Sequence, residues 1–127
     1  MSLKKVHTNN APAAVGPYSQ AMIAGDFVYV SGQLPINPET GKMVTTTVKD
    51  QTRQSLENAK AILKEAGTSL ENVVKTTVFL QNMGDFGDMN EVYAEFFTDH
   101  KPARAAVEVA KLPLGADVEI QMVAYLK

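Results

Sequence analysis

The segment TVKDQTRQSLENAKAILKEAG, residues 47–67, decides the fold class because its apolar period differs from that of the flanking sequence. Small and apolar residues recur in it at steps of three and four: Val48, Thr52, Leu56, Ala59, Leu63 and Ala66. This period predicts an amphipathic helix. Gly67 is placed to end it, because glycine readily adopts the left-handed backbone of a helix C-cap.

The sequence before this helix predicts strands. A short strand at residues 3–7 is followed by the loop TNNAPAAVGPYS, residues 8–19. The segment QAMIAGDFVYVSGQL, residues 20–34, contains two apolar runs separated by Gly25-Asp26, a pair suited to a tight turn. We therefore expect a hairpin, with a further turn at NPETG, residues 37–41.

The sequence after the helix predicts a strand at residues 72–81 and a second helix within residues 84–100, with Asp85 as its N-cap. Two more strands are expected at residues 104–109 and 118–126, paired as a hairpin. Two amphipathic helices can cover only one face of a sheet. We therefore expect one domain, residues 1–127, with an α+β fold in two layers.

The second face of this sheet is expected to be apolar as well. In residues 27–30, Phe27 and Tyr29 alternate with Val28 and Val30, so both rows of side chains are hydrophobic. A sheet with one wet face shows a cleaner alternation of apolar and polar residues. No further chain is left to cover this face, which indicates a homo-oligomer.

Arg104 and Glu119 are the main candidates for chemistry. If the last two strands form a hairpin, the alternation puts both side chains on the sheet face away from the helices. The planar guanidinium matches a carboxylate in bidentate fashion, which indicates a site for a small carboxylate ligand. An ion pair between Arg104 and Glu119 themselves explains the same residues equally well.

Composition excludes several other classes. There are no cysteines, so disulfides and thiolate chemistry are absent, and the net charge of −2 argues against nucleic acid as the main partner. His7 and His100 have no second ligand at metal spacing, and Ser31 lacks the surroundings of a hydrolase nucleophile. We find no leader or membrane span in the sequence and expect a cytoplasmic protein with no metal.

Six blocks in order resemble the Rid family, also called the YjgF family, over residues 8–126. They are APAAVGPYSQA, VYVSGQLPINPETG, QTRQSLENAKAILKEAG, VVKTTVFLQNMGDFGDMNEVYAEFF, PARAAVEVAKLP and VEIQMVAY. The nearest branch is the reactive intermediate deaminase A group. The resemblance implies a chorismate-mutase-like fold with a mostly antiparallel mixed sheet, and a homotrimer with clefts between its subunits.

The resemblance also implies an activity, the hydrolysis of 2-aminoacrylate and similar enamines or imines to 2-keto acids and ammonia without a cofactor. It assigns the carboxylate-binding arginine to Arg104 and its acidic partner to Glu119. The other cleft residues that it implies are Tyr18, Ser31, Gly32 and Asn90. Many members have a cysteine two residues after the arginine, where this chain has Ala106.

Two other functions remain open at this point. A non-catalytic protein that senses 2-keto or amino acids would use Arg104 in the same way, with little need for Glu119. An endoribonuclease is less favoured, because the chain has neither a basic stripe nor a histidine pair.

Overall fold

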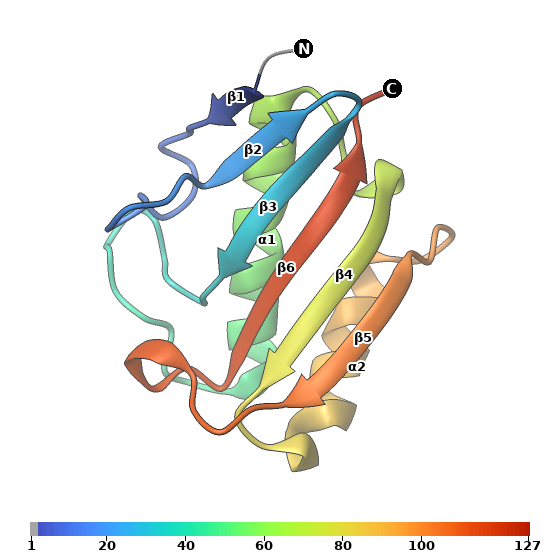
Figure 1. Ribbon diagram of the computed structural model, residues 1–127. Helices are drawn as coiled ribbons and strands as arrows, with labels where there is room; N and C mark the ends of the chain where they lie inside the picture. The colour runs from blue at the N-terminus through green and yellow to red at the C-terminus, as the bar shows by residue number, and fades with distance from the viewer. Residues whose placement is uncertain (1–2) are drawn as a thin grey trace.

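The computed structural model describes residues 3–127, and these form one six-stranded sheet with two helices (Figure 1). The strands are β1 (Leu3–Val6), β2 (Ala21–Ala24), β3 (Phe27–Gln33), β4 (Val73–Leu80), β5 (Ala103–Glu108) and β6 (Val118–Tyr125). The helices are α1 (Val48–Ala66) and α2 (Phe86–Phe96). Three short 3₁₀ helices, η1 (Leu70–Asn72), η2 (Met83–Asp85) and η3 (Pro113–Gly115), lie in the connections.

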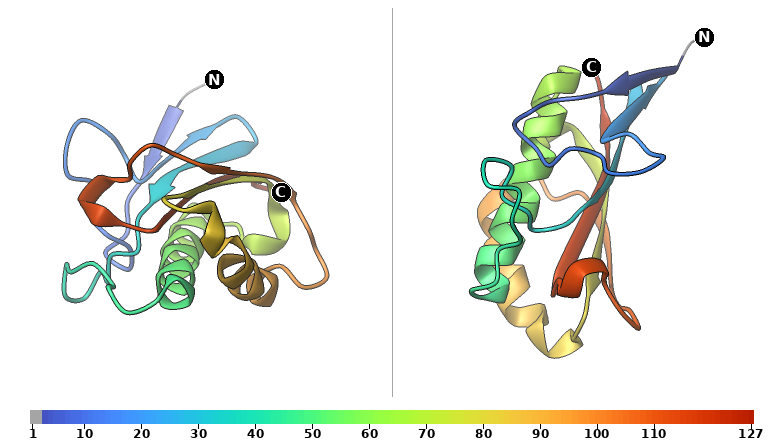
Figure 2. Two further views of the ribbon diagram at one scale, coloured as in Figure 1. Left: turned by 90° about the horizontal axis from the view of Figure 1, so that it is seen from below. Right: turned by 90° about the vertical axis from the view of Figure 1, so that its left-hand side faces the viewer.

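The strand order is β1-β2-β3-β6-β4-β5, and every neighbouring pair is antiparallel except β4 and β5. Both helices lie on one side of this sheet, and no helix of residues 3–127 covers the other side (Figure 2). The predicted α+β fold in two layers is therefore confirmed, as is the hairpin of β2 and β3 around Gly25. Within residues 3–127, no helix combines the length and hydrophobicity needed to cross a membrane.

The predicted hairpin of the last two strands is wrong. Strand β6 lies between β3 and β4, whereas β5 lies at the sheet edge, parallel to β4. The reason is the α2 crossover: a strand, a helix and a second strand in succession form a βαβ unit, whose two strands are parallel. The chain then returns through residues 109–117 to insert β6 on the far side of β4. This order changes the faces on which the candidate residues lie.

The ends of α1 are those that the sequence predicts. Thr47 is the N-cap, and its side chain accepts a hydrogen bond from the Asp50 backbone N–H at 3.0 Å. Gly67 is the C-cap, with φ of 94°. Asp85 occupies the N-cap position of α2, but its side chain makes no capping hydrogen bond there. The Asn82 side chain instead accepts from the Gly84 backbone N–H in the turn before it, at 2.8 Å.

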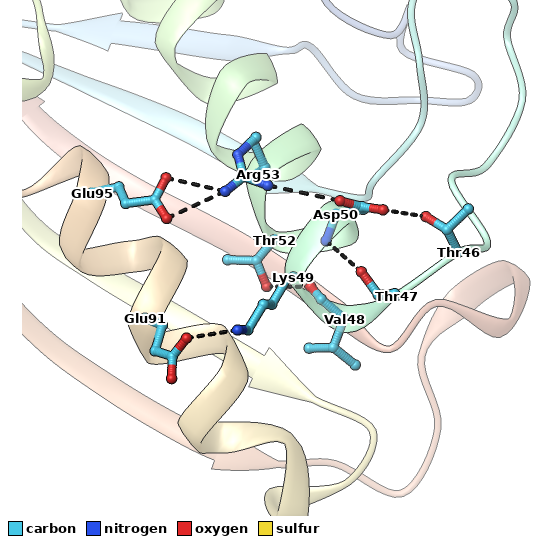
Figure 3. Close-up of polar contacts among 9 residues, drawn as sticks. All are labelled: Thr46, Thr47, Val48, Lys49, Asp50, Thr52, Arg53, Glu91 and Glu95. Atoms are coloured by element: carbon cyan, nitrogen blue, oxygen red, sulfur yellow. Dashed lines mark hydrogen bonds and ion pairs between the residues drawn. The ribbon is translucent and has the colours of Figure 1, made fainter.

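Two ion pairs tie α2 to α1 (Figure 3). Lys49 Nζ lies 2.7 Å from Glu91, and Arg53 lies 3.1 Å from Glu95, one turn further along both helices. All four side chains are substantially exposed, so each pair contributes at most about 1 kcal/mol. Their main effect is to fix how α2 is aligned along α1, and α2 in turn contacts the side chains that project from β5.

The core lies between the sheet and the helices, and no element of residues 3–127 packs on the sheet face that points away from the helices. Its fully buried side chains come mainly from α1, β4 and β6: Leu56, Ile62, Leu63, Val78, Leu80, Ile120 and Met122. On the other face, Phe27, Tyr29 and Tyr125 are 36%, 49% and 37% exposed. The chain thus leaves an apolar sheet face uncovered, as the sequence predicts. The oligomer inferred from that face stays a prediction.

Candidate active site

Arg104 projects from β5 toward α2, where neutral groups hold its guanidinium. In the parallel register Arg104 lies opposite Thr76, which is fully buried on the helix side of β4. Arg104 Nη1 donates a hydrogen bond to Asn90 Oδ1 on α2 at 2.7 Å. Its Cζ lies 4.6 Å from the ring centre of Tyr93 and 5.4 Å from that of Phe86. Such distances are typical of cation–π contacts.

The predicted placement of Arg104 on the face away from the helices is therefore wrong. Glu119 lies opposite Phe79 on β4, and Thr76 lies opposite Met122, so the alternation puts Glu119 on the open face and Arg104 on the helix face. Among residues 3–127, no carboxylate lies within ion-pair distance of Arg104. The ion pair between Arg104 and Glu119 that the sequence left open does not form within this chain.

Glu119 is a half-buried carboxylate packed against Gly32. A Cβ added to Gly32 would lie 2.5 Å from Glu119 Oε2, so only glycine lets the carboxylate approach the β3 backbone this closely. Burial raises the pKa of Glu119 above its ordinary value. No side chain within residues 3–127 pairs with it as a cation. A carboxyl of this kind is suited to take and return a proton.

Ser31 and Gly32 form a bulge in β3. Val30 lies opposite Met122 and Gln33 lies opposite Ile120, so two residues of β3 face the single residue Gln121 on β6. A bulge bends a strand and redirects its side chains. Here it turns the Ser31 hydroxyl toward the loop before β2, where it donates a hydrogen bond to the Ser19 carbonyl at 2.6 Å.

Hydrogen bonds of the Gln20 side chain hold the loop that carries Tyr18. The Gln20 side chain is buried; it accepts from the Thr8 backbone N–H at 2.7 Å and donates to the carbonyls of Thr8 and Pro12 at 3.0 and 2.9 Å. Tyr18 itself is 53% exposed near the tip. A hollow of about 260 Å³ opens beside this loop, lined in part by Ser19, Tyr29 and Ser31.

The structure thus groups the candidates into two sets. Tyr18, Ser31, Gly32 and Glu119 belong to the loop before β2 and to the open face of β3 and β6, whereas Arg104 and Asn90 lie at the other side of the sheet, between β5 and α2. Ala106 lies on the same side of β5 as Arg104 and packs against the core. Sequence reasoning missed the residues that support Arg104, namely Tyr93 and Phe86, whose rings lie beside the guanidinium, and Thr76, which contacts Tyr93. We call these residues, with Asn90, the seat of Arg104. Sequence reasoning also missed Gln20, whose side chain holds the loop before β2.

Chemically, the first set offers a carboxyl with a raised pKa beside the partly buried residues Ser31 and Gly32, and the second offers a cationic fork without an acidic partner among residues 3–127. A free guanidinium recognises a carboxylate or phosphate, and a free carboxyl of raised pKa can act on water. Within one chain the two sets lie on opposite faces of the sheet, so they do not form a single site there.

Comparison with known proteins identifies the family. The family model described as Endoribonuclease L-PSP matches residues 8–126. A RutC family protein of Pyrococcus horikoshii is 57% identical over 120 residues, which cover 94% of this chain and 95% of that protein. The 2-iminobutanoate/2-iminopropanoate deaminase of Escherichia coli K12 is 48% identical over 124 residues, covering 95% of this chain and 96% of the enzyme. The chain belongs to the Rid family.

The solved structures agree. A protein of the conserved Rid family from Yersinia pestis superposes with a TM-score of 0.96 at 46% identity, over 98% of this chain and 99% of that one. The sheet order and the two-layer arrangement described above are therefore those of Rid proteins. Relatives named as deaminases and a family model named for an endoribonuclease occur together, so membership of the Rid family alone does not fix the reaction.

Proposed function

We propose that this protein is an enamine/imine deaminase that hydrolyses 2-aminoacrylate-type intermediates to 2-keto acids and ammonia. The observation that carries the proposal is the Arg104 guanidinium, which is charged and exposed but unpaired by any carboxylate of residues 3–127. A 2-imino acid supplies the missing carboxylate. The similarity to an enzyme named as a 2-iminobutanoate/2-iminopropanoate deaminase supports this choice of substrate.

The site is completed between two copies of the chain. Arg104 and Glu119 lie on opposite faces of one sheet, so a single copy cannot present both to one small substrate. The uncovered apolar face around Tyr29 and Tyr125 needs a partner. A homotrimer in which the open face of one chain packs against the β5 edge of its neighbour would bring Arg104 of one chain to Glu119 of the next, giving three clefts.

In such a cleft Arg104 would bind the substrate carboxylate as a fork and thereby fix the adjacent C=N carbon. Glu119 would take a proton from a water molecule as its oxygen adds to that carbon. Returning this proton to nitrogen gives a carbinolamine, whose hydroxyl proton then moves to the amine through the same carboxyl, so that ammonia leaves as the C=O bond of the 2-keto acid forms. Imine hydrolysis is intrinsically easy, so positioning and one proton relay are sufficient catalysis. The backbone at Ser31 and Gly32 and the Tyr18 side chain would line the cleft.

The test couples a serine or threonine dehydratase to this protein and follows release of pyruvate or 2-ketobutyrate. We expect release faster than the spontaneous rate, and a loss of at least about tenfold in kcat/KM for Arg104→Lys, which keeps the charge but not the fork. Unchanged turnover in that variant contradicts the role of Arg104.

Glu119→Gln separates an enzyme from a sensor. It should lower kcat while the affinity for 2-ketobutyrate, measured by calorimetry, stays within about twofold. A wild-type protein that binds 2-ketobutyrate but does not accelerate release would be a binding protein.

A further inference from the structure

The buried phenol of Tyr93 connects Arg104 to the sheet. The Tyr93 ring lies 4.6 Å from Arg104 Cζ, and its hydroxyl lies 2.7 Å from Thr76 Oγ1. Tyr93 is 7% exposed and Thr76 is fully buried. Thr76 is also the residue opposite Arg104 in the parallel register. The three side chains therefore form a chain of contacts from β4 through α2 to the guanidinium on β5.

Each contact restricts a different motion of the guanidinium. The hydrogen bond to Thr76 fixes the Tyr93 ring, because rotating the ring away would leave a buried hydroxyl without a partner. The fixed ring supports the cation through its π-face, and Phe86 provides a second ring at 5.4 Å. Asn90 Oδ1 accepts from Nη1 and so sets the orientation of the fork.

All of these partners are neutral, so they leave the positive charge of Arg104 available to a ligand. Arginine has five N–H donors, and within residues 3–127 one of them is used by a side chain, that of Asn90. The seat thus immobilises the guanidinium without neutralising its charge. A carboxylate at the position of Asn90 would have immobilised it too, but would have competed with a substrate.

We propose that Tyr93, held by Thr76, is a positioning residue that presents the Arg104 fork in one fixed plane to a planar carboxylate. The proposal rests on the proposed function for its ligand, but the seat itself can be measured without any turnover. It assigns Asn90 to orienting Arg104, where the sequence had placed it among the substrate-binding residues.

Two variants remove the seat in different ways, and a third is the matched control. Tyr93→Leu removes the ring, and Thr76→Val removes only the hydroxyl with little change of shape. Phe96→Leu makes the same aromatic-to-aliphatic change on α2 at a half-buried side chain without a ring contact to Arg104. Thermal unfolding of all three shows which retain the native fold.

The first readout is the ¹H–¹⁵N NMR signal of the Arg104 guanidinium, assigned by its loss in Arg104→Lys. In the wild type we expect ring-current-shifted signals with slow exchange, preserved in Phe96→Leu. Thr76→Val should broaden them and Tyr93→Leu should move them to random-coil positions. Wild-type signals in both Tyr93→Leu and Thr76→Val would overturn the proposal; if Tyr93→Leu fails to fold, Thr76→Val decides alone.

The second readout is kinetic. Tyr93→Leu should raise both KM for the imine and Kd for 2-ketobutyrate about threefold to tenfold, the range of a lost cation–π contact, with kcat within about twofold. If Tyr93 only stabilised the fold, Tyr93→Leu and Phe96→Leu would change kcat and KM in the same way, in proportion to their loss of stability. If the wild type shows no Arg104-dependent hydrolysis while the NMR result holds, the proposed function fails and the positioning role stands.

Discussion

Replacing Gly32 by alanine should remove most of the activity while the fold survives. The added Cβ would lie 2.5 Å from Glu119 Oε2 and 2.9 Å from its Cδ. Since non-bonded atoms settle at roughly 3.5 Å, the carboxylate must move by about 1 Å. Displacing a reacting group by about 1 Å costs on the order of 100-fold in rate. We therefore expect kcat to fall about 100-fold in the dehydratase-coupled assay.

The free energy of unfolding should change little in the same variant. The clash is with the end of a flexible side chain, and forcing Glu119 off its rotamer costs about 0.5–1.5 kcal/mol. Alanine at a residue outside the left-handed region recovers about 0.4–1 kcal/mol from the unfolded chain. The two effects nearly cancel, so urea denaturation should give a value within about 1 kcal/mol of the wild type.

Gly87→Ala is the matched control for this prediction. A Cβ added at Gly87, on α2, meets no atom within 4 Å. This variant should keep wild-type activity and gain about 0.5–1 kcal/mol from helix propensity. The reasoning about Glu119 is refuted if Gly32→Ala keeps a wild-type kcat, or if both alanine variants lose activity equally.

Three further predictions concern stability. Because burial raises the pKa of Glu119, the folded state binds the carboxyl proton more tightly than the unfolded state, and the stability gained from this proton is lost as pH rises. Glu119→Gln should therefore have a higher Tm than the wild type at pH 7, and the difference should vanish in acid. A lower Tm of the variant at pH 7 would contradict this. Gln20→Ala leaves the buried Thr8 N–H without its acceptor and should lower the free energy of unfolding by about 2–3 kcal/mol. The variant should also expose residues 9–19 to limited proteolysis, and an unchanged digestion pattern would show that other contacts hold this loop. Arg53→Met should cost less than about 1 kcal/mol at low salt and nothing measurable in 1 M NaCl, and a loss that persists in high salt would point to packing instead of charge.

The sequence predicts the elements of this fold well because their signals are local. The helical period of residues 48–66, its cap at Gly67 and the turn at Gly25 each depend on neighbouring residues, and all three agree with the structure. The open apolar face was also predictable, since Phe27 and Tyr29 belong to a strand with two hydrophobic rows. These features need no knowledge of which strands pair.

The order of the strands and the face of Arg104 could not be obtained in this way. Alternation within β5 separates Arg104 from Val107 but does not say which row faces the helices. Val107, the more hydrophobic choice, is 42% exposed on the open side, whereas Arg104 lies against α2. Arg104 stays exposed to solvent beside the rings of Tyr93 and Phe86, so its charge is not buried there, and Tyr93 looked like an ordinary core residue at helical spacing. Only the parallel register with Thr76 reveals the arrangement.

The most direct test of the shared site is complementation between two inactive variants. In the proposed homotrimer, Arg104→Ala and Glu119→Gln would each disable every cleft of their own assembly. If Arg104 of one chain acts with Glu119 of the next, each mixed trimer contains one intact cleft.

The measurement is deaminase activity after the two variants are unfolded, mixed in equal amounts and refolded together. Random assembly makes about three quarters of the trimers mixed, with one cleft in three intact, so activity should recover to roughly a quarter of the wild type. Mixed trimers, verified by mass spectrometry, that stay inactive would show that the two residues do not act across a subunit interface.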